Sequence, residues 1–203
     1  MFVYFDLGNV LLFFSHERAA RQMAEVAGVP YELVWELLWD HELELRYEAG
    51  QITSDQFYQE FCEQTGTRPD RQKLLFASGA IFEVNVPMKA VASAVQSAGY
   101  RTGILSNTCE AHWDYCIDGR YGGLPDAFDV LVLSYELRAM KPAAEVYEAA
   151  IRMAGVPAGE IFFVDDRAEN VAGAIAAGID AVLYTTTPQL VADLRRRGLE
   201  FNY

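Results

Sequence analysis

Cysteine and positive charge are both scarce in this 203-residue sequence. Its three cysteines, Cys62, Cys109 and Cys116, are too few for a disulfide framework, so we interpret them as free thiols of a reducing compartment. The 16 lysine and arginine residues stand against 29 aspartate and glutamate residues, a net charge of −13. Such a surface repels phosphate backbones and anionic lipid head groups, which argues against nucleic acid and membranes as partners.

Long apolar runs and targeting signals are missing as well. The chain opens with Met-Phe-Val-Tyr-Phe and then an aspartate, and it lacks the basic segment and apolar stretch of a signal peptide. No run is long enough to cross a membrane. We find no internal repeat and no low-complexity segment, and the hydrophobic fraction of 52% is typical of a globular domain. We therefore expect a soluble protein of the cytoplasm.

Short apolar runs alternate with amphipathic patterns along most of the chain. The amphipathic patterns, for example over residues 88–98 and 146–153, indicate helices, and Pro142 suits the first turn of the second one. Strands that alternate with helices and are apolar along their whole length predict an α/β fold, a Rossmann-like parallel sheet with helices on both faces. The expected strands are residues 2–5, 103–105, 130–133, 161–164 and 181–184.

One long segment breaks this alternation. Between residues 15 and 81 the apolar residues follow helical spacing without a convincing strand, and the Thr-Ser-Asp sequence at 53–55 is typical of a helix start. An all-helical insertion directly after the first strand suggests a domain that covers the sheet. We predict a helical cap over residues 15–81, inserted into an α/β core that is formed by residues 1–14 and 82–203.

Polar residues follow the apolar runs at the points where the predicted strands end. In a parallel sheet these carboxyl ends meet at one edge, where ligands bind. Each residue alone is ordinary there, since aspartate and serine commonly cap helices or lie in turns. Two adjacent aspartates, however, repel each other unless a cation lies between them. The residues that we expect at this edge are Asp6, Gly8, Ser106, Asn107, Asp165 and Asp166 after the strands, and Lys141, which comes before the next helix.

This set of side chains suits phosphoryl transfer through an aspartyl phosphate. A carboxylate such as Asp6 can attack phosphorus and form a covalent intermediate. Because the attack brings two anions together, the site needs positive charge, which Mg²⁺ held by Asp6 and the pair Asp165–Asp166 would supply. Lys141 would add a fixed positive charge, and Ser106 with neighbouring backbone N–H groups would hold the phosphate oxygens.

The order of these motifs resembles the haloacid dehalogenase superfamily over nearly the whole chain. Its four motifs are matched by FDLGNV from Phe5, LSNT from Leu105, MKP from Met140 and FVDD from Phe163. The YEAGQIT segment from Tyr47 is similar to the helical cap of one branch. That branch contains bacterial α-D-glucose-1-phosphate phosphatase and relatives of the soluble epoxide hydrolase phosphatase domain. Each motif alone is weak, but four of them in this order are specific.

The resemblance implies a role for each residue of the catalytic set. Asp6 would be the nucleophile, and Lys141 would stabilise the phosphoryl group. Ser106 and Asn107 would bind the phosphate oxygens.

The resemblance also implies the ligands of a magnesium ion. Asp6 would be the first ligand, and Gly8 would offer its backbone carbonyl. Asp166 would coordinate the metal directly, with Asp165 nearby or bound through water. Asn170 would either orient this loop or act as an ordinary polar residue on a helix.

One position departs from the family pattern. Most phosphatases of the superfamily have a second aspartate two residues after the nucleophile, which protonates the leaving oxygen, and here that residue is Gly8. General acid catalysis contributes about 10²–10⁴-fold. The change therefore implies a slow enzyme, a substrate with an easy leaving group, or another proton donor. His112 is a candidate for proton donation or substrate contact, since its spacing from Ser106 resembles that branch, and the alternative is a helix residue without a catalytic part.

Three aromatic residues of the predicted cap, Trp35, Trp39 and Tyr47, have two interpretations. They either pack inside the cap or line the substrate pocket, where an aromatic face would suit a sugar ring. Packing is the simpler interpretation for residues at helical spacing.

The sequence therefore predicts a Mg²⁺-dependent hydrolase that cleaves a small phosphate monoester, such as a sugar phosphate, through a phospho-aspartate at Asp6. Its partner would be a small phosphorylated metabolite. Three alternatives stay open: a 2-haloacid dehalogenase with the same nucleophile, a non-catalytic or regulatory binding protein with this fold, and a phosphotransferase. The pair Asp165–Asp166 argues against the dehalogenase, because it would hinder binding of a carboxylate substrate.

Overall fold

A five-stranded parallel sheet forms the centre of the protein. The computed structural model describes residues 1–123 and 127–203. The strand order is β5-β4-β1-β6-β7, so the first strand lies in the middle of the sheet. The predicted α/β fold class is confirmed. The strands are β1 (Phe2–Phe5), β4 (Arg101–Ser106), β5 (Val130–Leu133), β6 (Ile161–Asp165) and β7 (Asp180–Leu183).

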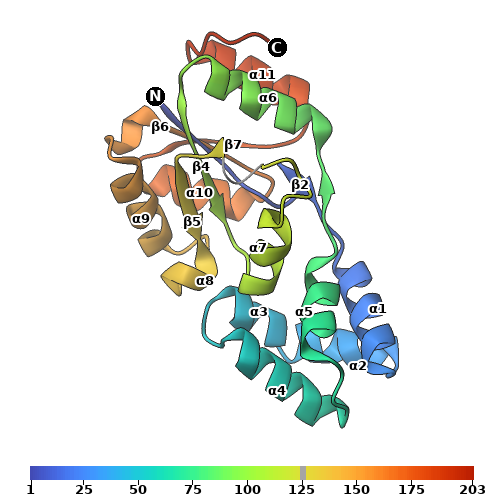
Figure 1. Cartoon of the computed structure of the whole chain (residues 1–203). Coiled ribbons are helices and arrows are strands. Elements are labelled where there is room, and N and C mark those ends of the chain that lie inside the picture. The colour runs from blue at the N-terminus through green and yellow to red at the C-terminus, as the bar shows by residue number, and fades with distance from the viewer. Residues whose placement is uncertain (124–126) are drawn as a thin grey trace.

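Helices cover both faces of this sheet because the apolar side chains of each strand alternate between the faces. On β1, Val3 and Phe5 pack into one apolar cluster, while Phe2 and Tyr4 pack into another. The first cluster is covered by α6 (Val86–Ser97) and α11 (Thr187–Arg196), and the second by α9 (Ala144–Ala154) and α10 (Ala168–Ala176). Figure 1 shows these two helix layers with the sheet between them. Two further helices, α7 (Glu110–Ile117) and α8 (Ser134–Leu137), follow β4 and β5.

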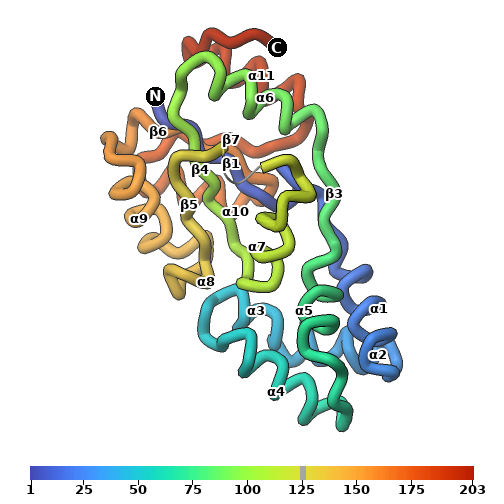
Figure 2. Tube along the Cα trace, in the orientation of Figure 1, coloured from blue at the N-terminus to red at the C-terminus, as the bar shows by residue number. Residues whose placement is uncertain are grey.

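Helices α1 to α5 form a separate group at one end of the molecule (Figure 2). They share an apolar cluster that includes Met23, Tyr47 and Phe57 and extends to Cys109 and Ala111 of the core. The segment leaves and rejoins the core through an antiparallel pair of two-residue strands, β2 (Leu12–Phe13) and β3 (Glu83–Val84). The helices are α1 (His16–Ala27), α2 (Tyr31–Trp35) with a π-helical turn over Glu36–Asp40, α3 (Leu43–Glu48), α4 (Ser54–Thr65) and α5 (Arg71–Gly79).

The expectation that Pro142 lies in the first turn of a helix is wrong. Helix α9 begins at Ala144, and Pro142 lies in a tight turn that is closed by the Ala143 N–H, which donates to the Met140 carbonyl at 2.9 Å. Proline fits the turn because it has no N–H that needs a partner. This turn also carries Lys141, so it positions a site residue.

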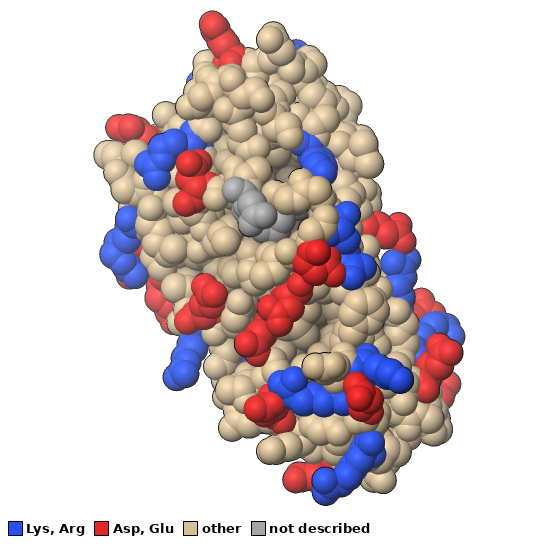
Figure 3. All heavy atoms as spheres, viewed as in Figure 1, with Lys and Arg blue, Asp and Glu red and all other residues tan. Residues whose placement is uncertain are grey.

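The surface carries charges of both signs. On the face drawn in Figure 3, acidic and basic side chains of the described residues are interspersed. Within residues 1–123 and 127–203, no helix has the length and apolar character needed to span a membrane.

Candidate active site

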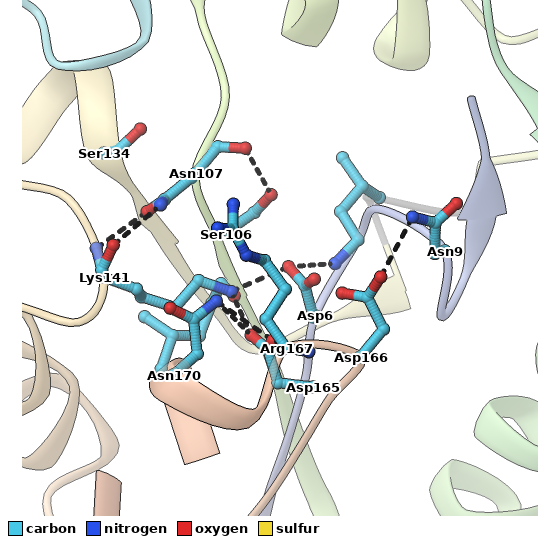
Figure 4. A network of polar contacts seen from close by, with 12 residues as sticks. Asp6, Asn9, Ser106, Asn107, Ser134, Lys141, Asp165, Asp166, Arg167 and Asn170 are labelled. Carbon is cyan, nitrogen blue, oxygen red and sulfur yellow. Dashed lines mark hydrogen bonds and ion pairs between the residues drawn. The ribbon is translucent and has the colours of Figure 1, made fainter. Parts of the chain in front are cut away.

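The carboxyl ends of β1, β4 and β6 meet at one edge of the sheet, as the strand register requires. Phe5 pairs with Ile104 on one side and with Val164 on the other, which sets Asp6 beside Leu105 and Asp165. Figure 4 shows these strand ends and the loops that follow them converging on one network of polar side chains. The residues predicted from the strand ends are therefore neighbours in space.

The ammonium group of Lys141 lies at the centre of this network. It donates to Asp6 Oδ1 at 2.8 Å, to Asp165 Oδ2 at 2.6 Å and to the Leu105 carbonyl at 2.8 Å. The Lys141 side chain is 1% exposed. A buried cation is stable only with such partners, so its three donors hold the two carboxylates and the end of β4 in fixed positions.

Asp165 and Asp166 differ in their surroundings although they are adjacent. Asp165 is fully buried, and besides Lys141 it accepts hydrogen bonds from Asn170 Nδ2, at 3.0 and 3.1 Å, and from the Arg167 N–H at 2.9 Å. Asp166 is only partly buried and accepts one hydrogen bond at Oδ2, from Asn9 Nδ2 at 2.9 Å. Asp165 is thus held by the protein, whereas Asp166 presents an oxygen to the cavity.

The arrangement of the carboxylates fits a hard divalent cation. Asp6, Asp165 and Asp166 each offer an oxygen within 4.8 Å of the others. The pKa of Asp6 is raised from 3.8 to about 7, chiefly by burial; the charge of Lys141 opposes this rise, and the charge of Asp165 adds to it. One lysine therefore does not neutralise three carboxylates. A bound divalent cation, which prefers oxygen ligands, would favour the ionised form of Asp6.

Asn107, the residue directly after β4, holds the loop that carries Lys141. The Asn107 amide donates to the Lys141 carbonyl at 3.0 Å and accepts from the Lys141 N–H at 2.8 Å. The Ser106 hydroxyl donates to the Asn107 carbonyl at 3.2 Å. The Asn107 side chain is thus engaged with the backbone of the lysine loop, a positioning contact that the sequence did not indicate.

Gly8 lies in the loop after β1, close to the ring of Phe14. A Cβ at this position would lie 2.9 Å from Phe14 Cε1. The ring therefore occupies the space into which a side chain at residue 8 would project, and only glycine fits without displacing it.

A cavity of about 280 Å³ opens above Asp6 and is lined from both parts of the molecule. The core contributes Asp6, Lys141 and Asp166, and the helical segment contributes Trp39, Glu44 and Glu48. Of the three aromatic residues, Trp39 lines the cavity and packs at a tilt against Trp35 with ring centres 4.5 Å apart, while Tyr47 is buried among the helices and stacks on Phe57. The two interpretations thus apply to different residues.

His112 lies beside the larger cavity in a buried position. It is 5% exposed, and its Nε2 is 3.5 Å from Glu44 Oε1, which also accepts from the Cys109 thiol at 3.6 Å. Burial lowers the pKa of His112 to about 4. Together with Ser106, it lines a small adjoining pocket of about 40 Å³. A neutral imidazole in this position is a poor proton donor at neutral pH.

Several cavity residues were not found from the sequence, above all Glu44 and Glu48. Their spacing of four residues on a helical pattern places them on one face, but the sequence does not show which face meets the core. Arg167 and Asn9 were also missed, although each lies next to or near a predicted residue.

Sequence comparison gives one family and several characterised relatives. The chain matches the haloacid dehalogenase-like hydrolase family over residues 2–178. It is 28% identical to the pyrimidine 5'-nucleotidase YjjG of Escherichia coli over 157 residues, which are 73% of this chain and 66% of that protein. It is 23% identical to the D-ribitol-5-phosphate phosphatase of Bacteroides thetaiotaomicron, over 96% of this chain and 94% of that one.

Structure comparison gives the same fold. A haloacid dehalogenase family enzyme of Bacteroides thetaiotaomicron, solved in complex with magnesium and inorganic phosphate, superimposes with a TM-score of 0.79 at 24% identity. The match covers 91% of this chain and 93% of that one.

Proposed function

Because the chain belongs to the haloacid dehalogenase-like hydrolase family, we propose that it hydrolyses a small phosphate monoester with the help of Mg²⁺. The observation that carries the proposal is the buried Lys141 ammonium, which bridges Asp6 and Asp165 beside the partly exposed Asp166. Relatives named as a nucleotidase and as a sugar-alcohol phosphatase support the same reaction type.

In the proposed reaction Asp6 is the nucleophile. An Asp6 oxygen bonds to phosphorus, the bond to the ester oxygen breaks, and water then cleaves the phospho-aspartate. Lys141 and the backbone N–H groups after Ser106 would stabilise the charge on the phosphoryl oxygens. Asp6, the Gly8 carbonyl and Asp166 would hold Mg²⁺, with Asp165 behind them, and the ion would supply the positive charge that two approaching anions require.

The cavity supports a proposal for the substrate class. A volume of about 280 Å³ accommodates a small metabolite, and one wall carries an indole ring and two glutamates that can accept hydrogen bonds from hydroxyl groups. This lining suits the phosphate of a sugar or sugar alcohol. We propose that residues 15–81 act as a cap that selects this substrate and excludes bulk water during the reaction.

Phosphate release tests this proposal. The wild-type protein should release phosphate from some members of a panel of sugar, sugar-alcohol and nucleoside monophosphates and p-nitrophenyl phosphate when Mg²⁺ is present. Release should stop with EDTA, return with added Mg²⁺, and be lost in Asp6→Asn, which keeps the shape of the side chain but not its nucleophilic charge.

Other outcomes would favour the alternatives. No release across the panel, with Mg²⁺ still bound, would indicate a non-catalytic binding protein. Transfer of labelled phosphate to an alcohol would indicate a phosphotransferase, and halide release from 2-haloacids without metal would indicate a dehalogenase.

A further inference from the structure

An ester of an aliphatic alcohol needs a proton donor as well as a nucleophile. When the bond to phosphorus breaks, the leaving oxygen would otherwise depart as a strongly basic alkoxide. The donor must face the same cavity as Asp6. The loop after β1 offers none at residue 8, because Gly8 has no side chain and the Phe14 ring fills the adjacent space.

We propose that Glu48 is the general acid of the reaction, an inference that rests on the proposed phosphatase function. Glu48 lines the cavity of about 280 Å³ together with Asp6 and Lys141. It also lines the adjoining pocket of about 40 Å³ that contains Gly8 and Ser106. It is thus the carboxylic acid of the helical segment that borders both spaces around the nucleophile.

The backbone at Glu48 is hydrogen-bonded to the core, which fixes the point from which the side chain extends. The Ser134 hydroxyl at the start of α8 donates to the Glu48 carbonyl at 2.6 Å. Two residues later, Gly50 has a φ of +63°, and a Cβ there would lie 2.2 Å from the Tyr135 carbonyl oxygen. The end of α3 therefore packs directly on α8, and Glu48 lies where the helical segment meets the core.

The electrostatic surroundings of Glu48 suit a group that gives up a proton and takes it back. Burial raises its pKa from 4.5 to about 7, while the charges of Arg167 and Lys141 oppose the rise. Glu44 faces it from the preceding turn of α3, and the charge of Glu48 in turn raises the pKa of Glu44. A catalytic acid is most effective when its pKa lies near the working pH.

The other titratable groups around the cavity are less suited to this role. Burial lowers the pKa of His16 and brings that of His112 to about 4, so both rings are neutral near pH 7. Glu44 has a pKa raised to about 8 by burial, but its carboxyl is engaged with the Cys109 thiol and lies close to His112.

The proton balance is complete with Glu48 alone. In the first step an Asp6 oxygen bonds to phosphorus, the ester bond breaks, and the leaving oxygen takes the Glu48 proton and departs as an alcohol. In the second step water bonds to phosphorus and returns a proton to the Glu48 carboxylate, and the bond to Asp6 breaks to release hydrogen phosphate. The site is therefore equipped for esters of aliphatic alcohols, despite the glycine at residue 8.

Comparing two leaving groups in Glu48→Gln tests this role. For the best aliphatic ester of the panel, kcat should fall by about 10²–10⁴-fold, because the amide cannot protonate the leaving oxygen. For p-nitrophenyl phosphate, whose leaving group is stable as an anion, kcat should change by less than about threefold. The fall of kcat/KM on the alkaline side of the wild-type pH profile should disappear for the aliphatic ester.

Two further variants separate proton donation by Glu48 from a general effect on the structure. Glu44→Gln makes the same chemical change one turn earlier on α3 and should change kcat for both esters alike, because Glu44 gives no proton to either leaving group. Glu48→Asp keeps a carboxyl and should recover part of the loss on the aliphatic ester, while circular dichroism shows that each variant is folded.

Three results would overturn the inference. These are an equal loss on both esters in Glu48→Gln, an unchanged alkaline limb, and a leaving-group difference that appears in Glu44→Gln instead. If the folded wild-type protein hydrolyses neither ester, the proposed function fails and the inference falls with it, a result distinct from an active wild type with equal losses.

Discussion

Among single residues, Lys141 is one whose loss should lower stability and activity together. Its ammonium group contacts Asp6 and Asp165 at 2.8 and 2.6 Å in a fully buried position. Lys141→Met removes the cation and leaves two carboxylates buried together. We expect the free energy of unfolding to fall by about 3–5 kcal/mol, as for other broken buried ion pairs. Urea unfolding at neutral pH measures the change.

The same substitution should lower phosphatase activity by about 10²-fold or more, because a positive charge is lost where negative charge develops. Lys73→Met is the control, since Lys73 is an exposed lysine of α5 and its loss should leave stability within about 0.5 kcal/mol. If the two variants were equally stable, the Lys141 cation would not be holding the two carboxylates together.

At the scale of secondary structure elements, the contact between the turn after α3 and helix α8 fixes how the helical segment meets the core. Gly50 and Gly66 both have a positive φ, of +63° and +68°, but only Gly50 lies against another backbone, that of Tyr135. Gly50→Ala adds this collision to the backbone strain, whereas Gly66→Ala adds strain alone. We expect Gly50→Ala to cost about 1–3 kcal/mol more in urea unfolding.

Activity gives a second measure of the same contact. Gly50→Ala should also lower kcat, because the displaced turn carries Glu48, while Gly66→Ala should leave kcat close to the wild-type value. Equal losses of stability in the two variants would mean that the turn does not depend on close packing against α8.

Local patterns predicted the elements whose own residues carry a clear signal, an apolar run or a helix cap. Residues 2–5 and 130–133 form strands with the predicted bounds, and α4 begins after Thr53, whose side chain forms a reciprocal capping box with Gln56. Strands β2 and β3 were not predicted, because a strand of two residues shows no periodicity. In addition, Leu12 and Phe13 pair with Val84 and Glu83, which lie far away along the chain, and local patterns carry no information on such a contact.

Which site residues could be predicted also depends on whether local patterns or long-range contacts place them. Asp6 and Asp165 could be expected to converge, since strand ends of a parallel sheet share one edge, and Lys141 was expected there because it precedes the next helix. Glu48 could not, because the face that α3 turns toward the core depends on how the whole helical segment packs. The engagement of the Asn107 amide with the lysine loop is likewise a tertiary contact.

At the scale of the whole molecule, the two parts of the chain contribute different side chains to one cavity. The core supplies the carboxylates and the lysine, and helices of the segment over residues 15–81 supply Trp39, Glu44 and Glu48. Under the proposed function, core substitutions should therefore affect every phosphate ester, because all esters share the phosphoryl group. The effects of substituting Trp39 or Glu48 should instead depend on the alcohol part of the substrate.

Trp39 provides the test of this division. Its indole lines the cavity and is supported by Trp35 and by the His16 ring, whose centre lies 5.0 Å away. If the indole contacts a sugar or sugar-alcohol group, Trp39→Ala should raise KM for that phosphate by about 2- to 10-fold, the range expected from an aromatic contact of about 0.5–1.5 kcal/mol. For acetyl phosphate, which has no such group, KM should change less. An equal rise in KM for both substrates would show that Trp39 supports the structure of the segment and takes no part in selecting the substrate.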